Sequence, residues 1–264
     1  MLAPLPHDAD TRPAPQPRDL IAGLEKGLAV ICAFDQERPL LSVTEVAERC
    51  GLTRAAARRY LITLEHLGYM RSERGRWSLS AKVLRLAQSY MHSGRLPRIV
   101  QPELHRLVSA LKEASSAGVL DGDDVICIAA LTAGHLVSST LQPGTRVPAY
   151  CTANGRVLLA ALPPAELDAW LARQALEPRT PHTLTDPERL RAEIGRVRAQ
   201  GYALVDQELE PGLRTLSVPL VSADGQVLAA LNVSAHAARR SADQLIDECL
   251  PALRQTQAAL RRQL

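Results

Sequence analysis

The stretch that most constrains the fold is residues 42–79, where two helices are predicted around a sharp turn. A short helix is expected over 43–49, and a second helix opens directly after Thr53. Thr53 is a good N-cap, because its hydroxyl can accept a hydrogen bond from a free amide of the first helical turn. Gly51 can adopt the left-handed backbone conformation that ends the first helix. The pattern predicts a helix-turn-helix motif at about 42–61.

A basic hairpin is predicted after the second helix. Gly68 ends that helix, and 69–71 and 76–79 are expected to form two short strands around the turn at 72–75. The result would be a winged helix-turn-helix. Residues 53–85 contain only two acidic side chains, Glu65 and Glu73. The same stretch contains eight basic ones, which are Arg54, Arg58, Arg59, Arg71, Arg74, Arg76, Lys82 and Arg85. Such a concentration of positive charge favours DNA as the partner.

The apolar side chains of the second helix predict which face turns to the core. Ala56, Tyr60, Leu64 and Leu67 recur at i, i+4, i+8 and i+11, so this stripe is expected to be buried. Tyr60 is expected to pack in the core rather than stack on a base, and so is Trp77. The alternative is a solvated basic face in a winged helix that binds another protein. The positions expected to face solvent or DNA are Arg54, Ala55, Arg58 and Arg59.

The rest of the chain predicts a second, mixed domain. With 264 residues there is room for two domains. Two hairpins are expected, with turns at 121–124 and 222–225, so the fold class is α/β (α+β) with a largely antiparallel sheet. A further strand is expected at 135–141. The helices expected outside the motif lie at about 19–34, 81–92, after Pro97, at 152–161, at 165–172, at 187–199 and at 241–262, the last with an interruption near Pro251.

Composition and spacing exclude several classes of protein. The five cysteines are odd in number and contain no CxxC, which argues against a disulfide framework or a zinc finger and fits a reducing cytoplasm. Cys151 lacks a His-Asp pattern that would activate a thiolate. No phosphate loop, GxSxG or HExxH motif occurs, so neither an enzyme nor a cofactor or metal site is expected. No apolar run approaches the ~20 residues of a membrane span.

Several stretches in order along the chain resemble the IclR family of bacterial transcription regulators, over about 20–262. They are TEVAERCGLTRAAARRYLITLEHLGY, LDGDDVICIA, GTRVPAYCTANGRVLLA, DQELEPGLRTLSVPL and DGQVLAALNVSAH. The forms TRAAARRYL, PAYCTANGRVLLA and VDQELEPGLR look most like the PcaR/PcaU/PobR branch, which controls catabolism of aromatic acids. Five prolines among the first 17 residues predict a disordered tail (1–18). The resemblance implies a winged helix-turn-helix domain (19–80), a linker helix (81–94) and a GAF-like effector-binding domain (95–264).

The resemblance also implies where DNA and effector bind. The start of the second motif helix would enter the major groove, and the wing would contact the DNA backbone. A small carboxylate effector, an aromatic acid or a β-ketoadipate-pathway metabolite, would bind in the second domain, with Arg214 as a further possible carboxylate partner. The predicted DNA-binding residues are Thr53, Arg54, Ala55, Arg58, Arg59, Arg74 and Arg76. The predicted effector-binding residues are Arg146, Tyr150, Ala153, Asn154, Asp206, Glu208, Thr215, Asn232 and Ser234.

The sequence leaves three possible functions. A DNA-binding regulator would be a homodimer or homotetramer on a palindromic operator, with Leu84, Leu86 and Tyr90 of the linker helix as candidate dimer contacts. A protein-interaction module with a structural second domain would bind its partner with an affinity that does not depend on salt. It would not change the mobility of DNA in a gel. An enzyme is disfavoured by the missing motifs. Asp206 and Glu208 have a plainer alternative as surface or capping residues, and Asn232 and Ser234 as partners of buried backbone.

Overall fold

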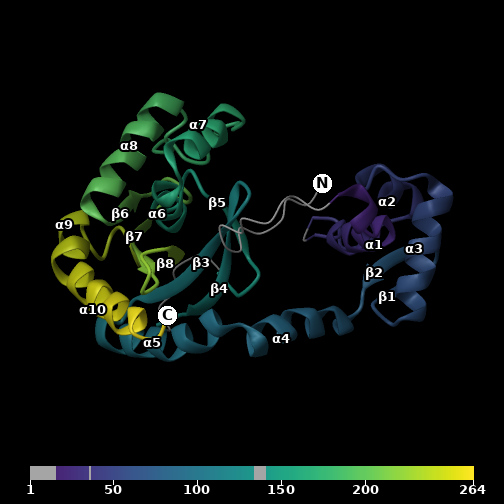
Figure 1. The fold of residues 1–264 in the computed structure, drawn as a ribbon, viewed down its shortest axis with the longest axis horizontal. Helices are drawn as coiled ribbons and strands as arrows, with labels where there is room; N and C mark the ends of the chain where they lie inside the picture. Colours follow the sequence, from purple (N-terminus) through teal and green to yellow (C-terminus); the bar gives the residue numbers. More distant parts are fainter. Residues whose placement is uncertain (1–15, 36, 134–140) are drawn as a thin grey trace. The chain divides into compact units, whose positions relative to one another are not determined.

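The computed structural model describes residues 16–35, 37–133 and 141–264. The chain divides into two compact units, Met1–Tyr90 and Met91–Leu264, which are described one at a time (Figure 1). The tail predicted for 1–18 lies almost entirely outside the described residues; its last part forms one 3-10 turn, η1 (Pro17–Asp19). The strand predicted at 135–141 also lies outside them, apart from Leu141.

The first unit contains the predicted helix-turn-helix motif. Its helices are α1 (Ala22–Cys32), α2 (Val43–Arg49) and α3 (Arg54–His66). Ser42 and Glu45 form a reciprocal capping box at the start of α2, and the hydroxyl of Thr53 accepts the Ala56 amide at 3.2 Å at the start of α3. Gly51, in the turn, has a φ of +61°. These local features confirm the predicted motif.

The predicted wing is also present. Strands β1 (Met70–Glu73) and β2 (Arg76–Leu79) pair antiparallel, and Glu73 lies opposite Arg76. The two residues between them have positive φ, +50° at Arg74 and +77° at Gly75, as a tight two-residue hairpin requires. Glu65 of α3 accepts hydrogen bonds from the amide and hydroxyl of Ser72, which ties the wing to that helix.

Of the stripe predicted for α3, only Leu64 is buried. The buried residues are Ala57, Leu61 and Leu64, whereas Leu67 is 48% exposed. Tyr60 is half-buried beside Gly23 and Gly27 of α1. The three alanines at 55–57 are equally apolar, so they do not indicate which side of α3 is buried. In the structure the buried side begins at Ala57 rather than at Ala56. Trp77 is buried, as expected.

The second unit is built on one antiparallel sheet. Its strand order is β5-β4-β3-β8-β7-β6. The predicted hairpins are β3–β4 and β7–β8, and every neighbouring pair is antiparallel. β5 and β6, at the two edges, are not predicted from the sequence. The strands are β3 (Ala114–Asp121), β4 (Asp124–Leu131), β5 (Arg146–Pro148), β6 (Ala203–Asp206), β7 (Leu213–Val221) and β8 (Val227–His236).

Helices cover both faces of this sheet (Figure 1). α5 (Arg95–Leu111) and α10 (Leu250–Arg261) pack on one face around Leu104, Leu231 and Leu253. On the other face, α6 (Ala153–Ala161), α7 (Pro164–Ala172) and α8 (Pro187–Gln200) enclose a second core around Leu159, Trp170 and Ile194. α6 contacts the sheet directly, so its N-terminus lies over the strands.

Three helix boundaries differ from the expectation. The linker region is a 3-10 turn, η2 (Ala81–Val83), followed by α4 (Leu84–Ser93), and α5 begins at Arg95 rather than after Pro97. A proline in the first turn removes only an amide that has no helical partner. The predicted interruption near Pro251 is a π-helical turn, η3 (Leu245–Cys249), between α9 (Ala242–Gln244) and α10.

Candidate functional site

The N-terminal turns of α3 present a basic, unpaired face. Arg54, Ala55, Arg58 and Arg59 are all exposed, and so is Thr53. Among the described residues, none of these three arginines forms an ion pair. Their guanidinium groups are therefore available to an anionic partner.

The wing adds two further predicted residues, which differ in their surroundings. Arg74 is exposed at the hairpin tip and has no ion pair within the described chain. Arg76 donates to the Leu40 carbonyl at 3.3 Å, and its Nη1 lies 3.6 Å from Oε2 of Glu45. Arg76 is thus partly engaged within its own unit, whereas Arg74 is not.

The second unit contains a cavity between the sheet and the start of α6. Its volume is about 60 Å³. Five of the nine predicted effector residues line it: Ala153, Asn154, Thr215, Asn232 and Ser234. β7 and β8 bring the last three together, because Thr215 pairs with Ser234 in the register and the side chains of Asn232 and Ser234 share one face of β8.

Hydrogen-bond donors without partners converge on this cavity. Thr152 caps α6 by accepting from the Gly155 amide at 3.2 Å, which leaves the amides of Ala153 and Asn154 without an acceptor among the described residues. Asn154 accepts from the Ser217 hydroxyl at 2.7 Å through Oδ1, so its Nδ2 is also unpaired there. The helix dipole adds partial positive charge at the same point. An anion placed at the start of α6 would meet several donors.

The opposite wall is arranged around Asn232. Its Oδ1 accepts from both the amide and the hydroxyl of Ser116, each at 2.9 Å, and its carbonyl accepts from Ser115. These serines were not predicted, because β3 was expected to begin only at Val119. Asn232 therefore also has the backbone-satisfying role given above as the alternative. The apolar part of the lining is Val125, Leu131, Leu141, Val147, Val205, Leu209 and Leu213.

Two thiols complete the cavity lining. Burial raises the pKa of Cys127 to about 11 and that of Cys151 to about 11. Both are therefore neutral at physiological pH. No charged side chain lines the cavity in the part of the chain that the structure describes.

Four predicted effector residues do not line the cavity. Arg146 is exposed and is bonded to Asp121 and Asp124 in the β3–β4 turn. Asp206 forms a two-pronged ion pair with Arg214, at 2.9 and 2.8 Å, and this arginine holds the pKa of Asp206 below its usual value. Arg214, the other candidate carboxylate partner, is occupied by the same contact.

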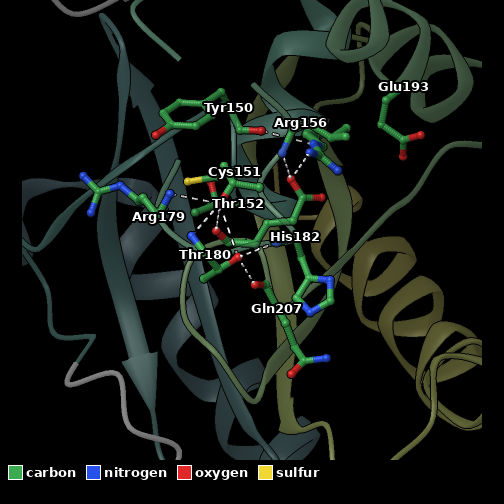
Figure 2. Close-up of polar contacts among 12 residues, drawn as sticks. Tyr150, Cys151, Thr152, Arg156, Arg179, Thr180, His182, Glu193 and Gln207 are labelled. Carbon is green, nitrogen blue, oxygen red and sulfur yellow. Dashed lines mark hydrogen bonds and ion pairs between the residues drawn. The ribbon is translucent and has the colours of Figure 1, made fainter. Parts of the chain in front are cut away.

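The remaining two, Tyr150 and Glu208, are both bonded to the buried Arg156. Figure 2 shows Tyr150 and Arg156 in this network. Nη2 of Arg156 lies 2.6 Å from Oε2 of Glu208, and the Tyr150 hydroxyl donates to the Glu177 carbonyl at 2.7 Å. Arg156 was not singled out in the sequence. Nothing in the GRVLLA stretch distinguishes this buried arginine from one exposed on the surface of a helix.

The described residues contain neither a metal-binding cluster nor a membrane-spanning helix. No three His, Cys, Asp or Glu side chains gather there in an arrangement that could hold a metal ion. No helix in the described ranges combines the length and the apolar character needed to cross a membrane.

The sequence matches known families over nearly its whole length. Residues 23–74 match the IclR helix-turn-helix domain, and residues 88–262 match the bacterial transcriptional regulator IclR C-terminal domain. The chain belongs to the IclR family of bacterial transcriptional regulators. It is thus a DNA-binding regulator whose C-terminal unit is the family's effector-binding domain, as the resemblance implied.

Individual IclR-family relatives are similar over most of the chain. The Pca regulon regulatory protein of Pseudomonas putida is 46% identical over 236 residues, which cover 89% of this chain and 81% of that protein. A transcriptional regulator from Rhodococcus sp. RHA1 has a crystal structure that matches with a TM-score of 0.79 and 40% identity, covering 93% of this chain and 98% of that one.

One IclR-family structure contains a small acid. It is a double mutant of the inducer-binding domain of the Acinetobacter PobR transcription factor, in complex with 3-hydroxybenzoic acid. It matches with a TM-score of 0.60 and 32% identity, and covers 62% of this chain and 97% of that one.

Proposed function

We propose that this IclR-family regulator controls genes of aromatic-acid catabolism, and that its effector is a small organic acid bound at the start of α6. The observation that carries the proposal is the cavity itself, in which unpaired amide donors at a helix N-terminus face apolar walls. An aromatic acid, or a β-ketoadipate-pathway metabolite, offers the matching carboxylate. The 3-hydroxybenzoic acid bound by the Acinetobacter domain supports this class of ligand.

The residues proposed to contact the effector are those that line the cavity. The amides of Ala153 and Asn154, with Nδ2 of Asn154, would hold the carboxylate. Thr215 and Ser234, whose hydroxyls lie 3.5 Å apart, and Asn232 would meet a ring substituent. The effector would then shift operator occupancy by binding one conformation of the protein more tightly than another.

The effector class is tested by thermal unfolding of the whole protein with 3-hydroxybenzoate, 4-hydroxybenzoate, protocatechuate and β-ketoadipate. A ligand at a hundred times its Kd stabilises the folded state by about 2.7 kcal/mol. For a domain of this size the Tm should rise by roughly 5–10 °C. A matched non-acid, phenol, should produce no comparable shift, because it cannot use the donors at α6.

Two variants locate the site. Asn154→Leu and Ser234→Leu replace polar lining groups with apolar ones and fill the cavity, so the Tm rise should disappear in both. Ser217 keeps its bond to the Leu231 carbonyl in the first variant. Unchanged titrations in both folded variants would remove this cavity as the effector site.

DNA binding is proposed to use the exposed face of α3 and the wing. The start of α3 would enter the major groove and contact base edges and phosphates through Thr53, Arg54, Ala55, Arg58 and Arg59. Arg74 and Arg76 would contact the DNA backbone. The protein-interaction alternative would leave DNA mobility unchanged at all salt concentrations.

A homodimer or homotetramer on a palindromic operator follows from exposed apolar faces in the first unit. Ile21, the N-cap of α1, and Leu24 and Leu28 on the helix are 74%, 62% and 42% exposed. On α4, the predicted contacts Leu84, Leu86 and Tyr90 are 64%, 47% and 41% exposed. Leu86 and Tyr90 are four residues apart and share a helix face. Exposed apolar patches of this kind mark interaction sites. We propose that a second copy of the chain covers them.

This assembly is tested by charge insertion. Leu24→Glu combined with Leu28→Glu should convert the protein to monomers in sedimentation velocity, because buried carboxylates would have no partner at the interface. A palindromic duplex should then be bound far more weakly. Leu40→Glu, at a leucine that is 50% exposed outside both helices, is the matched control. An unchanged sedimentation coefficient in the double variant would count against the α1 face.

The proposed function also bears on enzymatic activity and on the cellular compartment. Among the described residues, the cavity lining contains donors for binding an anion but no activated nucleophile, so we propose that the chain has no enzymatic activity. Because its partner is chromosomal DNA, the proposed compartment is the cytoplasm, where its reduced cysteines are also expected.

A further inference from the structure

A buried ion pair lies behind the cavity, and neither of its members lines it. Arg156 and Glu208 are joined by the 2.6 Å contact between Nη2 and Oε2, and their side chains are 2% and 9% exposed. A buried ion pair often contributes no more stability than well-packed apolar side chains of similar volume. Its presence here therefore calls for a reason other than stability.

Each partner is connected to a segment of the cavity wall, Arg156 by a hydrogen bond and Glu208 by its place in the chain. Nε of Arg156 donates to the Tyr150 carbonyl at 3.2 Å, directly before the lining segment Cys151–Asn154. Glu208 is followed in the chain by Leu209, which lines the wall on the β6 side. The ion pair therefore links two parts of the cavity wall from behind.

A third segment is attached to the same pair. Oε2 of Glu208 accepts the Leu184 amide at 3.0 Å, and its carbonyl accepts the Thr183 hydroxyl at 2.7 Å. The Thr180 hydroxyl donates to the Gln207 carbonyl at 2.7 Å. Figure 2 shows how these contacts gather around Arg156 and the residues before α6. The segment between α7 and α8 is thereby fixed to the cavity wall as well.

We propose that Arg156 and Glu208 are positioning residues for effector binding. The pair holds the start of α6, with the free amides of Ala153 and Asn154, at a set distance from the wall at Leu209. It touches no effector itself. The link to effector affinity rests on the proposed function above, whereas the bracing of the wall does not.

The first test replaces the pair by apolar side chains of similar volume, Arg156→Met with Glu208→Leu. Unpaired buried backbone groups cost about 1–3 kcal/mol each, so the Tm should fall by several degrees while the protein stays folded at 25 °C. The Tyr150 carbonyl and the Leu184 amide lose their partners, so Kd for 3-hydroxybenzoate, measured by calorimetry, should rise at least tenfold. A wild-type Kd in the folded variant would overturn the proposal, because a pair needed only for packing would leave affinity unchanged.

A second measurement needs no effector. The rate at which a disulfide reagent modifies Cys151 is followed by peptide mass mapping, with Cys249 as the internal control. Cys151 lies in the braced wall, while Cys249 is buried in the core on the other face of the sheet. The apolar pair should accelerate modification of Cys151 at least tenfold and leave Cys249 unchanged. Equal Cys151 rates in wild type and variant would overturn the brace.

Further variants distinguish loss of the brace from unfolding of the protein. If both thiols react faster, the double variant has unfolded, and Glu208→Gln at low temperature provides the same ratio of rates with side-chain volume preserved. Arg191→Met with Asp168→Leu removes an ion pair between α8 and α7, away from the cavity lining, and should give wild-type rates. If wild type binds none of the four acids, the proposed effector class is wrong, but the Cys151 ratio still tests the brace.

Discussion

Replacing Arg58 with alanine is expected to lower affinity for a specific operator by about 10- to 100-fold, at ~1–3 kcal/mol for a bidentate contact with guanine. Arg58 is exposed on the second turn of α3 and has no ion pair among the described residues. Removing it costs no packing, so the Tm should not change. Adding Arg54→Ala, one turn earlier on the same face, should leave only non-specific affinity.

The measurement is fluorescence anisotropy on two duplexes at several salt concentrations. One duplex is the sequence that wild-type protein selects from a random library, and the other is its scrambled form. Arg74→Ala, at the tip of the wing, should weaken both equally and reduce the salt slope by about one, as loss of a phosphate contact does. Arg189→Ala, exposed on α8 of the other unit, should change neither.

The loss of affinity on the two duplexes shows whether α3 contacts bases, phosphates or neither. An Arg58→Ala variant that loses affinity equally on both duplexes would show a phosphate contact in place of base recognition. Unchanged binding would mean that the DNA interface lies elsewhere. The effector-induced Tm rise should be the same as in wild type, because the substitution lies in the other unit.

The helix-turn-helix could be predicted because its signals are local. Ser42, Gly51 and Thr53 each act on backbone groups within three or four residues, and all three do in the structure what their side chains or φ freedom predict. The face of α3 was harder, since Ala55 to Ala57 cannot indicate which side is buried. Only packing against α1 and the wing selects it.

The cavity shows where prediction from sequence ends. Ala153, Asn154 and Ser234 were predicted from the family resemblance, and they lie at a helix start and on one face of a strand, which are local patterns. Ser116 was missed, because its place follows from a register with Asn232 across 116 residues. Arg146 was misplaced for a related reason: its partners Asp121 and Asp124 are brought to it by the pairing of β4 with β5.

Gly155→Ala should be clearly destabilising. A Cβ at this position would lie 2.1 Å from the Ala149 carbonyl oxygen and 2.4 Å from its Cα. Both atoms are backbone, so the clash can be relieved only by moving the start of α6 away from the segment before it. Overpacking of this kind costs typically ~1–3 kcal/mol, occasionally more, and lowers the Tm by roughly 2–12 °C.

Gly195→Ala is the matched control and should have the opposite sign. Gly195 is exposed in the middle of α8, and a Cβ there would meet no atom within 4 Å. Alanine in a helix interior is favoured over glycine by about 1 kcal/mol, so the Tm should rise by roughly 2–4 °C. Calorimetry of both variants, with and without 3-hydroxybenzoate, gives the comparison.

Gly155→Ala should also lose the ligand-induced rise in Tm, because the amides of Ala153 and Asn154 move with α6. A wild-type Tm in Gly155→Ala would mean that α6 does not approach Ala149 as closely as the structure shows.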